Sequence, residues 1–176
     1  LATDDTVRVV VLAGAGKAFC ARHDLREMRA TPSHDYYRRL FDRCTRVMMA
    51  IQKMPQPVIA RVQGIATAAG CQLVAMCDLA VAAEDARFAV SGVNLGLFCS
   101  TPGVALSRNL HRKQAMEMLL TGDMIDAASA RERGLVNRVV PAAALDDEVA
   151  RLAASICAKP PAGVAAGKGL FYRHLG

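Results

Sequence analysis

The sequence predicts an α/β protein, because short runs rich in apolar β-branched residues alternate with segments of helical periodicity. Strand-like runs occupy residues 7–14, 57–64 and 78–84, and apolar residues recur at helical spacing between them. The order strand, helix, strand, helix, strand is typical of an α/β unit with right-handed crossovers. The chain has 176 residues, of which 53% are hydrophobic, so it is long enough for one core of ordinary size. This length favours a single domain.

The N-terminal part of the chain supplies the first strand and a long helix. Residues 7–14 (VRVVVLAG) are rich in Val and end on Gly, as in a buried strand, and a polar loop follows. Helical spacing predicts a helix over 24–30 and another over 35–53, packed on one face that includes Phe41 and Val47. The prolines that follow Lys53 end the second helix.

The remaining elements are shorter. Residues 57–64 predict a second strand that ends on Gly, and the small residues after it predict a helix over 66–77. Two short strands are expected at 78–84 and 86–90. The rest of the pattern predicts a helix over 112–122 that ends on Gly122, a helix over 126–134, a strand over 135–141 and a helix over 145–158.

Charge and hydropathy limit the classes of partner. The 22 Lys and Arg residues exceed the 16 Asp and Glu residues, which gives a net charge of +6 and favours an anionic partner. Aromatic residues make up only 5% and the basic residues are scattered, so nucleic acid is not the expected partner. No apolar run approaches the ~18 to 20 residues that cross a bilayer, and acids stand where a signal peptide needs positive charge. We expect a soluble protein that is not exported and binds no membrane.

The cysteines predict neither a disulfide framework nor a metal site. The six residues show no Cys-x-x-Cys pair and no spacing to His that is typical of zinc ligands. Reduced, mostly buried thiols are therefore expected, with no metal. They are Cys20, Cys44, Cys71, Cys77, Cys99 and Cys157.

A distinctive pattern runs through four segments in a fixed order: FCARHDLREM, PVIARVQGIATAAGCQLVAMCDLAVAAEDARFA, GVNLGLFCSTPG and AMEMLLTGDMIDAASARERGLVNRVVP. It resembles the crotonase (enoyl-CoA hydratase/isomerase) superfamily over roughly residues 7–170, and GVNLGLFCSTPGVAL looks most like the subgroup described as enoyl-CoA hydratase domain-containing proteins. The resemblance implies a crotonase-like ββα spiral (ClpP/crotonase fold), with two stacked sheets and outer helices. It also implies assembly as a homotrimer or hexamer.

The resemblance further implies that the site binds an acyl-CoA or enoyl-CoA thioester, with CoA carried as part of the substrate and no separate cofactor. By position, the carbonyl oxygen of the thioester would meet the backbone N–H groups of His23 and Ala69, which form an oxyanion hole. Lys17, Ala21 and Arg26 match positions that contact CoA in relatives. For the two cations, a solvated surface charge is the alternative interpretation.

Two positions depart from the pattern of hydratases in this family. Those enzymes place two glutamates over the substrate, because one group must activate water and another must deliver a proton. The matching positions here are Gln72 and Gly92. An amide can position a water molecule without accepting its proton, and glycine supplies only backbone, so ordinary hydration is doubtful.

Other residues near these segments offer alternative chemistry. The imidazole of His23 could act as a base, or it could simply be an exposed loop side chain. Arg22 stands where many relatives have a Gly that eases a tight backbone conformation. Asp24 and Glu27 are expected to pair with Arg26 or to cap the helix, in preference to a proton-transfer role. Cys99, Ser100 and Thr101 would lie in a loop near the acyl chain, as nucleophiles or as plain packing.

The predicted function is therefore an acyl-CoA thioester-binding enzyme of the enoyl-CoA hydratase/isomerase family. A non-catalytic acyl-CoA-binding subunit, an acyl-CoA thioesterase and, last, an RNA-binding protein are the alternatives. We expect a spiral core over residues 1–141 and the start of a C-terminal helical trimerisation region over 142–176. Relatives begin earlier and end later, so the chain is expected to be a fragment. The expected location is the cytoplasm, or the mitochondrial matrix in a eukaryote.

Overall fold

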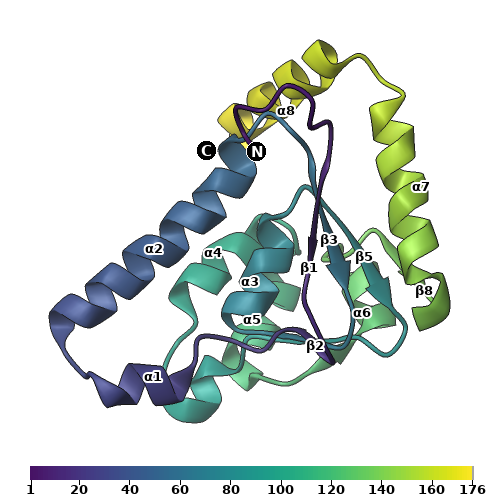
Figure 1. Ribbon diagram of the computed structural model, residues 1–176. Helices are drawn as coiled ribbons and strands as arrows, with labels where there is room; N and C mark the ends of the chain where they lie inside the picture. Colours follow the sequence, from purple (N-terminus) through teal and green to yellow (C-terminus); the bar gives the residue numbers. More distant parts are fainter. Residues whose placement is uncertain (176) are drawn as a thin grey trace.

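Two four-stranded sheets form the centre of the computed structural model, which describes residues 1–175 (Figure 1). The first sheet has the order β1-β3-β5-β8 and is parallel throughout. The second has the order β2-β4-β6-β7, in which only β7 runs antiparallel. The predicted α/β class is thus confirmed. The strands are β1 (Val10–Ala13), β2 (Ala18–Cys20), β3 (Val58–Val62), β4 (Ile65–Thr67), β5 (Leu79–Ala83), β6 (Arg87–Ala89), β7 (Ile125–Asp126) and β8 (Arg138–Val140).

Helices surround both sheets, as Figure 1 shows: α2 runs along one side, α7 along the other, and α3, α4 and α5 lie between them. The α-helices are α1 (Leu25–Ala30), α2 (His34–Lys53), α3 (Ala69–Met76), α4 (Ser100–Ser107), α5 (Arg112–Thr121), α6 (Ala127–Glu132), α7 (Leu145–Cys157) and α8 (Pro161–Leu175). Two 3₁₀ helices, η1 (Ser91–Leu95) and η2 (Ala142–Ala144), precede α4 and α7.

The central strands of the first sheet, β3 and β5, are buried on both faces, which explains their continuous apolar runs. On one face, Ile59 and Val81 pack with Leu145 and Val149 of α7. The side chains that point the other way belong to the larger core, which also includes Phe88 of the second sheet. The polar side of α7 is thereby left to solvent, as expected for an amphipathic helix.

Several predicted boundaries are confirmed by local chemistry. The carboxylate of Asp24 accepts hydrogen bonds from the backbone N–H groups of Arg26, at 2.8 Å, and Glu27, at 3.4 Å, so Asp24 is the N-cap of α1. Gly122 ends α5 with a left-handed φ of 68°. Asp126 caps α6 in the same way as Asp24 caps α1.

Other expectations were wrong. The helix predicted over 66–77 begins only at Ala69, because residues 65–67 pair with the second sheet as β4. The polar loop after residue 14 contains β2, and Ser100 and Thr101 lie in α4 instead of a loop. Phe41 and Val47 of α2 are 44% and 52% exposed instead of packed on the core.

A buried ion pair attaches α8 to the rest of the fold. The Lys168 ammonium donates to Asp78 Oδ2 at 2.6 Å and to the carbonyls of Ile51 and Gln56 at 2.8 and 2.9 Å. The Tyr172 hydroxyl donates to the other carboxylate oxygen at 2.8 Å, and burial with the neighbouring carboxylate raises the pKa of Tyr172. The side chain of Lys168 is only 6% exposed, so all of its donors are satisfied inside the protein.

The C-terminal helices therefore both contact the sheet region, one by apolar packing and the other by this ion pair. The division of the chain near residue 141 stays a prediction. Within residues 1–175, every helix is too short or too polar to cross a membrane.

Replacement of Lys168 by Met should strongly destabilise the fold. The variant leaves the Asp78 carboxylate buried without its cation, which costs about 3 to 5 kcal/mol of unfolding free energy. Tyr172→Phe removes one hydrogen bond to the same carboxylate and should cost about 1.5 to 3 kcal/mol. Urea unfolding followed by circular dichroism measures both.

Lys113 is a matched control, because it is an exposed lysine of α5. Lys113→Met should change the unfolding free energy by no more than about 0.5 kcal/mol. A smaller loss for Lys168→Met than for Tyr172→Phe would contradict a central role for the ion pair.

Candidate functional site

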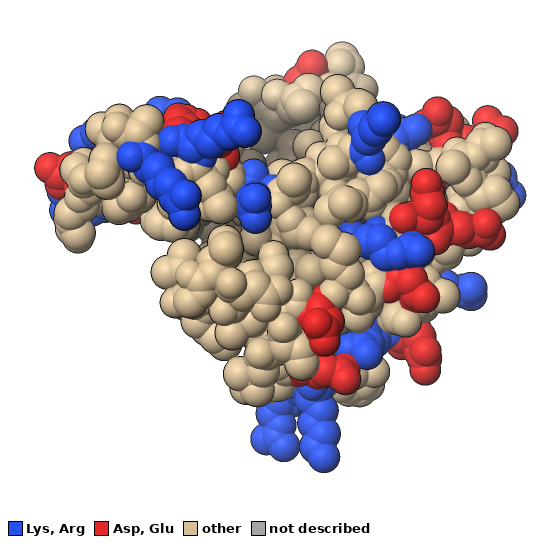
Figure 2. Space-filling model, turned by 90° about the horizontal axis from the view of Figure 1, so that it is seen from below, with Lys and Arg blue, Asp and Glu red and all other residues tan. Residues whose placement is uncertain are grey.

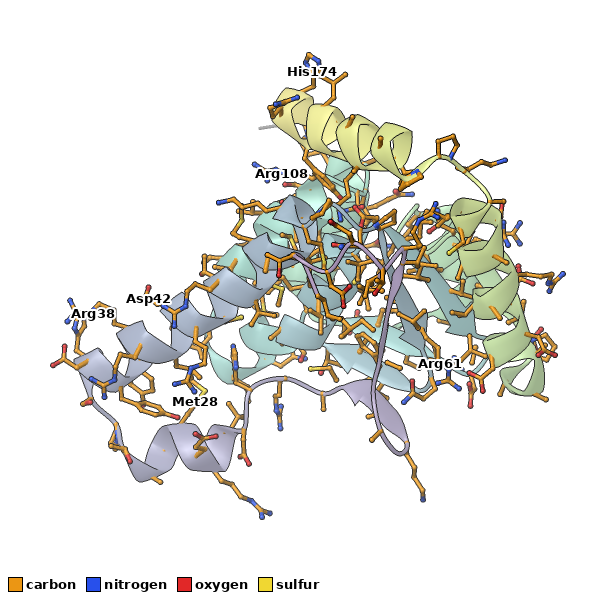
Figure 3. The ribbon with its side chains drawn as sticks, turned by 45° about the horizontal axis from the view of Figure 1, so that its top comes forward. Met28, Arg38, Asp42, Arg61, Arg108 and His174 are labelled. Carbon is orange, nitrogen blue, oxygen red and sulfur yellow. The ribbon has the colours of Figure 1, made fainter. Side chains whose placement is uncertain are left out.

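A cavity of about 330 Å³ opens between α1 and α2 on one side and the N-terminal ends of α3 and α4 on the other. Its outer wall is apolar and is formed by Leu25, Met28, Phe41, Leu95, Leu97 and Phe98. Figure 3 shows Met28 in the space between α1 and α2. The shape and polarity of this wall suit a flexible hydrocarbon chain.

The polar lining contains no carboxylate. Among residues 1–175, the polar side chains at the cavity are those of Arg22, His23, Gln72, Ser91, Ser100 and Thr101, together with the thiol of Cys99. The imidazole of His23 meets the ring of Phe41 edge-on, with 5.7 Å between the ring centroids. The predicted site residues His23, Ala69, Gln72 and Gly92, which are far apart in the sequence, thus line one cavity.

The inner wall is set by a close backbone approach between α3 and the end of β2. A Cβ atom at Gly70 would overlap the carbonyl oxygen of Cys20, so only glycine fits there. The Thr67 hydroxyl also donates to the carbonyl of Ala21. Ala68, at the N-cap of α3, has a positive φ of 49°, a conformation that costs an alanine of order 1–3 kcal/mol.

The predicted oxyanion hole falls on this wall. Ala69 is the first residue of α3, where a backbone N–H has no acceptor within the helix. His23 lies on the opposing loop, next to Arg22, whose φ of 142° is also positive. Arg22 therefore adopts a backbone conformation that is favourable mainly for glycine. This agrees with the sequence comparison, in which many relatives have a Gly at this position. The role of the two N–H groups stays a prediction.

Gln72 is held in place by α4. Its side chain is buried, and its Oε1 accepts a hydrogen bond of 3.4 Å from the hydroxyl of Thr101. Thr101 lies in the first turn of α4, beside the cavity. The sequence offered no signal for this contact, because 29 positions separate the two residues.

Gly92 is interlocked with Cys99. The backbone N–H of Gly92 donates to Cys99 Sγ at 3.2 Å. A Cβ atom at position 92 would lie 2.6 Å from the same sulfur and 2.9 Å from the carbonyl oxygen of Leu97. The sulfur therefore fills the space that a side chain at position 92 would need.

The three residues predicted to contact CoA lie outside this cavity lining. Lys17, Ala21 and Arg26 are all exposed, at the turn before β2, at its end and in α1. Figure 2 shows Lys and Arg side chains distributed over one face of the molecule and interspersed with acids. The structure brings Ala21 close to the inner wall through Thr67, whereas Lys17 and Arg26 are exposed outside the cavity.

The cysteines are all free thiols, and two of the six, Cys71 and Cys77, are buried. Burial raises the pKa of Cys71, which precedes Gln72 in α3, to about 12. It raises the pKa of Cys77 to about 12 as well. The expectation of mostly buried thiols was wrong, since Cys20, Cys44 and Cys99 are only half-buried and Cys157 is exposed. In the described part of the chain, no three His, Cys, Asp or Glu side chains cluster as metal ligands would.

The model of one protein family matches residues 1–175, and its description is enoyl-CoA hydratase/isomerase. The chain belongs to this family. The crotonase resemblance and the fold it implied are thus confirmed.

Solved structures of family members superpose on nearly the whole chain. One, described as enoyl-CoA hydratase from Mycobacterium smegmatis, is 69% identical with a TM-score of 0.96 and covers 98% of this chain and 67% of its own. Human enoyl Coenzyme A hydratase domain-containing protein 3 is 48% identical with a TM-score of 0.94, covering 99% of this chain and 69% of its own.

A curated relative supports the predicted subgroup. Enoyl-CoA hydratase domain-containing protein 3, mitochondrial, from Xenopus laevis is 49% identical over 174 residues, which are 99% of this chain. The match spans 59% of the length of that protein. The activity and partners of a longer protein are therefore treated as proposals below.

A side chain at position 92 should be less destabilising without the Cys99 sulfur, although the carbonyl oxygen of Leu97 stays close to its Cβ. Gly92→Ala should cost about 1 to 3 kcal/mol of unfolding free energy, because Cβ overlaps Sγ. In a Cys99→Ala background the cost should fall by at least about 0.5 kcal/mol, measured as a double-mutant cycle in urea.

Gly103 of α4 is the control position, because its Cβ would meet only the flexible side chain of Leu119 at 3.3 Å. The effect of Gly103→Ala should be the same with and without Cys99 Sγ. An equal loss of unfolding free energy from Gly92→Ala in both backgrounds would argue against the close contact between position 92 and Cys99 Sγ.

Thiol labelling should follow burial. With the pKa of Cys71 raised from about 9 to about 12, its thiolate fraction at pH 8 is roughly 1,000-fold lower than that of an ordinary cysteine. Iodoacetamide should label the exposed Cys157 first at pH 8 and the buried Cys71 far more slowly. Peptide mass spectrometry measures each site, and equal rates at pH 8 would contradict the assignment.

Proposed function

We propose that the chain binds an acyl-CoA thioester in this cavity and stabilises negative charge on the thioester oxygen through the backbone N–H groups of His23 and Ala69. The observation that carries the proposal is a cavity with an apolar outer wall and no carboxylate in its described lining. Membership of the enoyl-CoA hydratase/isomerase family supports the thioester as ligand. A pair of fixed donors is worth about 3 kcal/mol per donor in transition-state stabilisation.

Hydration at an ordinary rate is not part of the proposal. Addition of water to an enoyl group needs a base for the water and an acid for the carbanion carbon, and loss of such a group costs about 10²- to 10⁴-fold in rate. Gln72 and Gly92 supply neither, and Cys99 Sγ occupies the space beside Gly92.

Thioester hydrolysis is the second candidate reaction. The imidazole of His23 lines the same cavity as the proposed oxyanion donors, and imidazole is the commonest general base in enzymes. If His23 does not act as a base, the same cavity serves a non-catalytic acyl-CoA-binding subunit. The exposed positions of Lys17 and Arg26 are compatible with contacts to CoA phosphates in either case.

Assembly and location belong to the same proposal. We propose a homotrimer or hexamer, in the cytoplasm or, in a eukaryote, in the mitochondrial matrix. The name of the Xenopus laevis relative places that protein in mitochondria.

The chain should bind butyryl-CoA and crotonyl-CoA and should hydrate crotonyl-CoA at least ~100-fold more slowly than a hydratase that has both glutamates. A panel of saturated and 2-enoyl-CoA esters, with every product identified by mass spectrometry, tests this. Gain of one water at the rate of the reference hydratase would refute the account of the missing acids.

Release of free CoA distinguishes the remaining alternatives. Hydrolysis that disappears in His23→Ala, with butyryl-CoA binding retained, would assign a thioesterase base. Binding without any product would assign a binding subunit, and loss of all binding would remove the thioester proposal itself.

A further inference from the structure

The thiol of Cys99 belongs to the wall of the cavity at the end where the thioester is proposed to bind. Cys99 is the N-cap of α4, is half-buried and lines the cavity together with Gly92 and Ala69. The first turns of α3 and α4 are in contact, because the Thr101 hydroxyl and the Gln72 amide form a hydrogen bond of 3.4 Å. Gln72 follows Ala69 by one helical turn, and Thr101 follows Cys99 by two residues. The sulfur and the proposed oxyanion donor Ala69 are therefore neighbours across these two helix starts.

The local contacts hold the sulfur in place without using it in the fold. Cys99 Sγ accepts a hydrogen bond of 3.2 Å from the backbone N–H of Gly92 and makes no capping bond to α4. Of the six cysteines, all within the described residues, Cys99 is the one that lines the cavity. Cysteine is intrinsically a strong nucleophile at neutral pH. A nucleophile thus stands at a fixed position beside the ligand.

A second feature indicates that this part of the wall meets the polar end of a ligand. The side chain of Gln72 is only 8% exposed, and one end of its amide meets the Thr101 hydroxyl. Within residues 1–175 the other end has no hydrogen-bond partner, and Gln72 lines the cavity. Buried polar groups are nearly always hydrogen-bonded, so the unpaired end indicates that the cavity receives a polar group here. The hydrocarbon tail of a ligand would instead lie against the apolar outer wall.

The chemistry of a 2-enoyl thioester matches a thiol at this position. Its double bond is conjugated with the carbonyl group, so C3 is electrophilic. Attack of sulfur on C3 moves the electrons of the double bond toward the carbonyl oxygen and gives an enolate. The proposed oxyanion donors, the backbone N–H groups of His23 and Ala69, would stabilise that charge. The addition needs no carboxylate, in agreement with the described lining of the cavity.

We propose that Cys99 is a covalent attachment site for 2-enoyl thioesters, which it captures at C3 by conjugate addition. This inference rests on the proposed binding of an acyl-CoA thioester in the cavity. In the step, a bond forms between Sγ and C3 and the π bond between C2 and C3 breaks. The proton lost from sulfur is balanced by a proton taken up at C2 from water. No group leaves, so CoA stays attached to the captured acyl chain.

Mass spectrometry of the intact chain and of its peptides tests the proposal. The unmodified chain is incubated with crotonyl-CoA and then quenched with acid, which stops the reverse reaction. Cys99 should carry at least ~10-fold more crotonyl-CoA than the exposed Cys157, because binding raises the effective concentration of the enoyl group at the cavity thiol. Butyryl-CoA, which lacks the double bond, should form no adduct and in excess should protect Cys99.

Two variants separate capture in the cavity from general thiol reactivity. Cys99→Ser should lose the adduct, because a hydroxyl is a far weaker nucleophile than a thiol. Cys44→Ser is the matched control, since Cys44 is also half-buried but lies in α2 outside the cavity lining. It should form the adduct to the same extent as the unmodified chain. Thermal unfolding of each variant checks that it is folded.

The possible failures are distinguishable. Binding of butyryl-CoA in isothermal titration calorimetry, without an adduct of crotonyl-CoA at Cys99, would overturn this inference and leave the thioester proposal intact. Equal yields at Cys99 and Cys157 would do the same. A mass gain of the crotonyl group without CoA would show attack on the carbonyl carbon and would also overturn conjugate addition. No binding of either ester would overturn the proposed function itself.

Discussion

The contact between the backbone of α3 and the carbonyl of Cys20 determines where the cavity is. Since no Cβ fits at Gly70, α3 lies directly against the end of β2, and the register of β2 with β4 sets Cys20 opposite Ala66. The hydrogen bond from Thr67 to Ala21 then holds the start of the loop that carries the histidine. Without this approach, the two proposed oxyanion donors would belong to separate surfaces. The positive φ at the N-cap of α3 is a local strain that this packing sustains.

Strands and helices with strong local signals could be predicted from the sequence, and elements stabilised by distant partners could not. The apolar runs of β3 and β5 and the length of α2 were found because burial on both faces and helical periodicity leave a pattern. In contrast, β2 and β4 are three residues long, too short for any period. α8 contains Gly163, Gly167 and Gly169, which disfavour a helix by roughly 1 kcal/mol each. It is held to the core by the ion pair of Lys168 with Asp78, 90 positions away.

The candidate site likewise has parts that the sequence could predict and parts that it could not. The family pattern located His23, Ala69, Gln72 and Gly92, and the cavity brings their positions together. The contacts to Gln72 and Gly92 come from the N-terminal end of α4, where the sequence predicted a loop. Neither N-cap residue of α3 and α4 makes a side-chain capping bond, so no capping signature marked these helix starts. Sequence could therefore single out Gln72 and Gly92, but not the hydroxyl and the sulfur that contact them.

The two walls of the cavity differ in how firmly they are held, and this difference bears on selectivity. The inner wall consists of backbone and short side chains fixed by hydrogen bonds to Ala21, Gln72 and Gly92. The outer wall is made by long side chains of α1, α2 and the segment after η1, and α1 has no buried residue. Segments with few buried contacts open at low free-energy cost. We therefore expect the reactive end of an acyl group to be recognised strictly and the far end of its chain loosely.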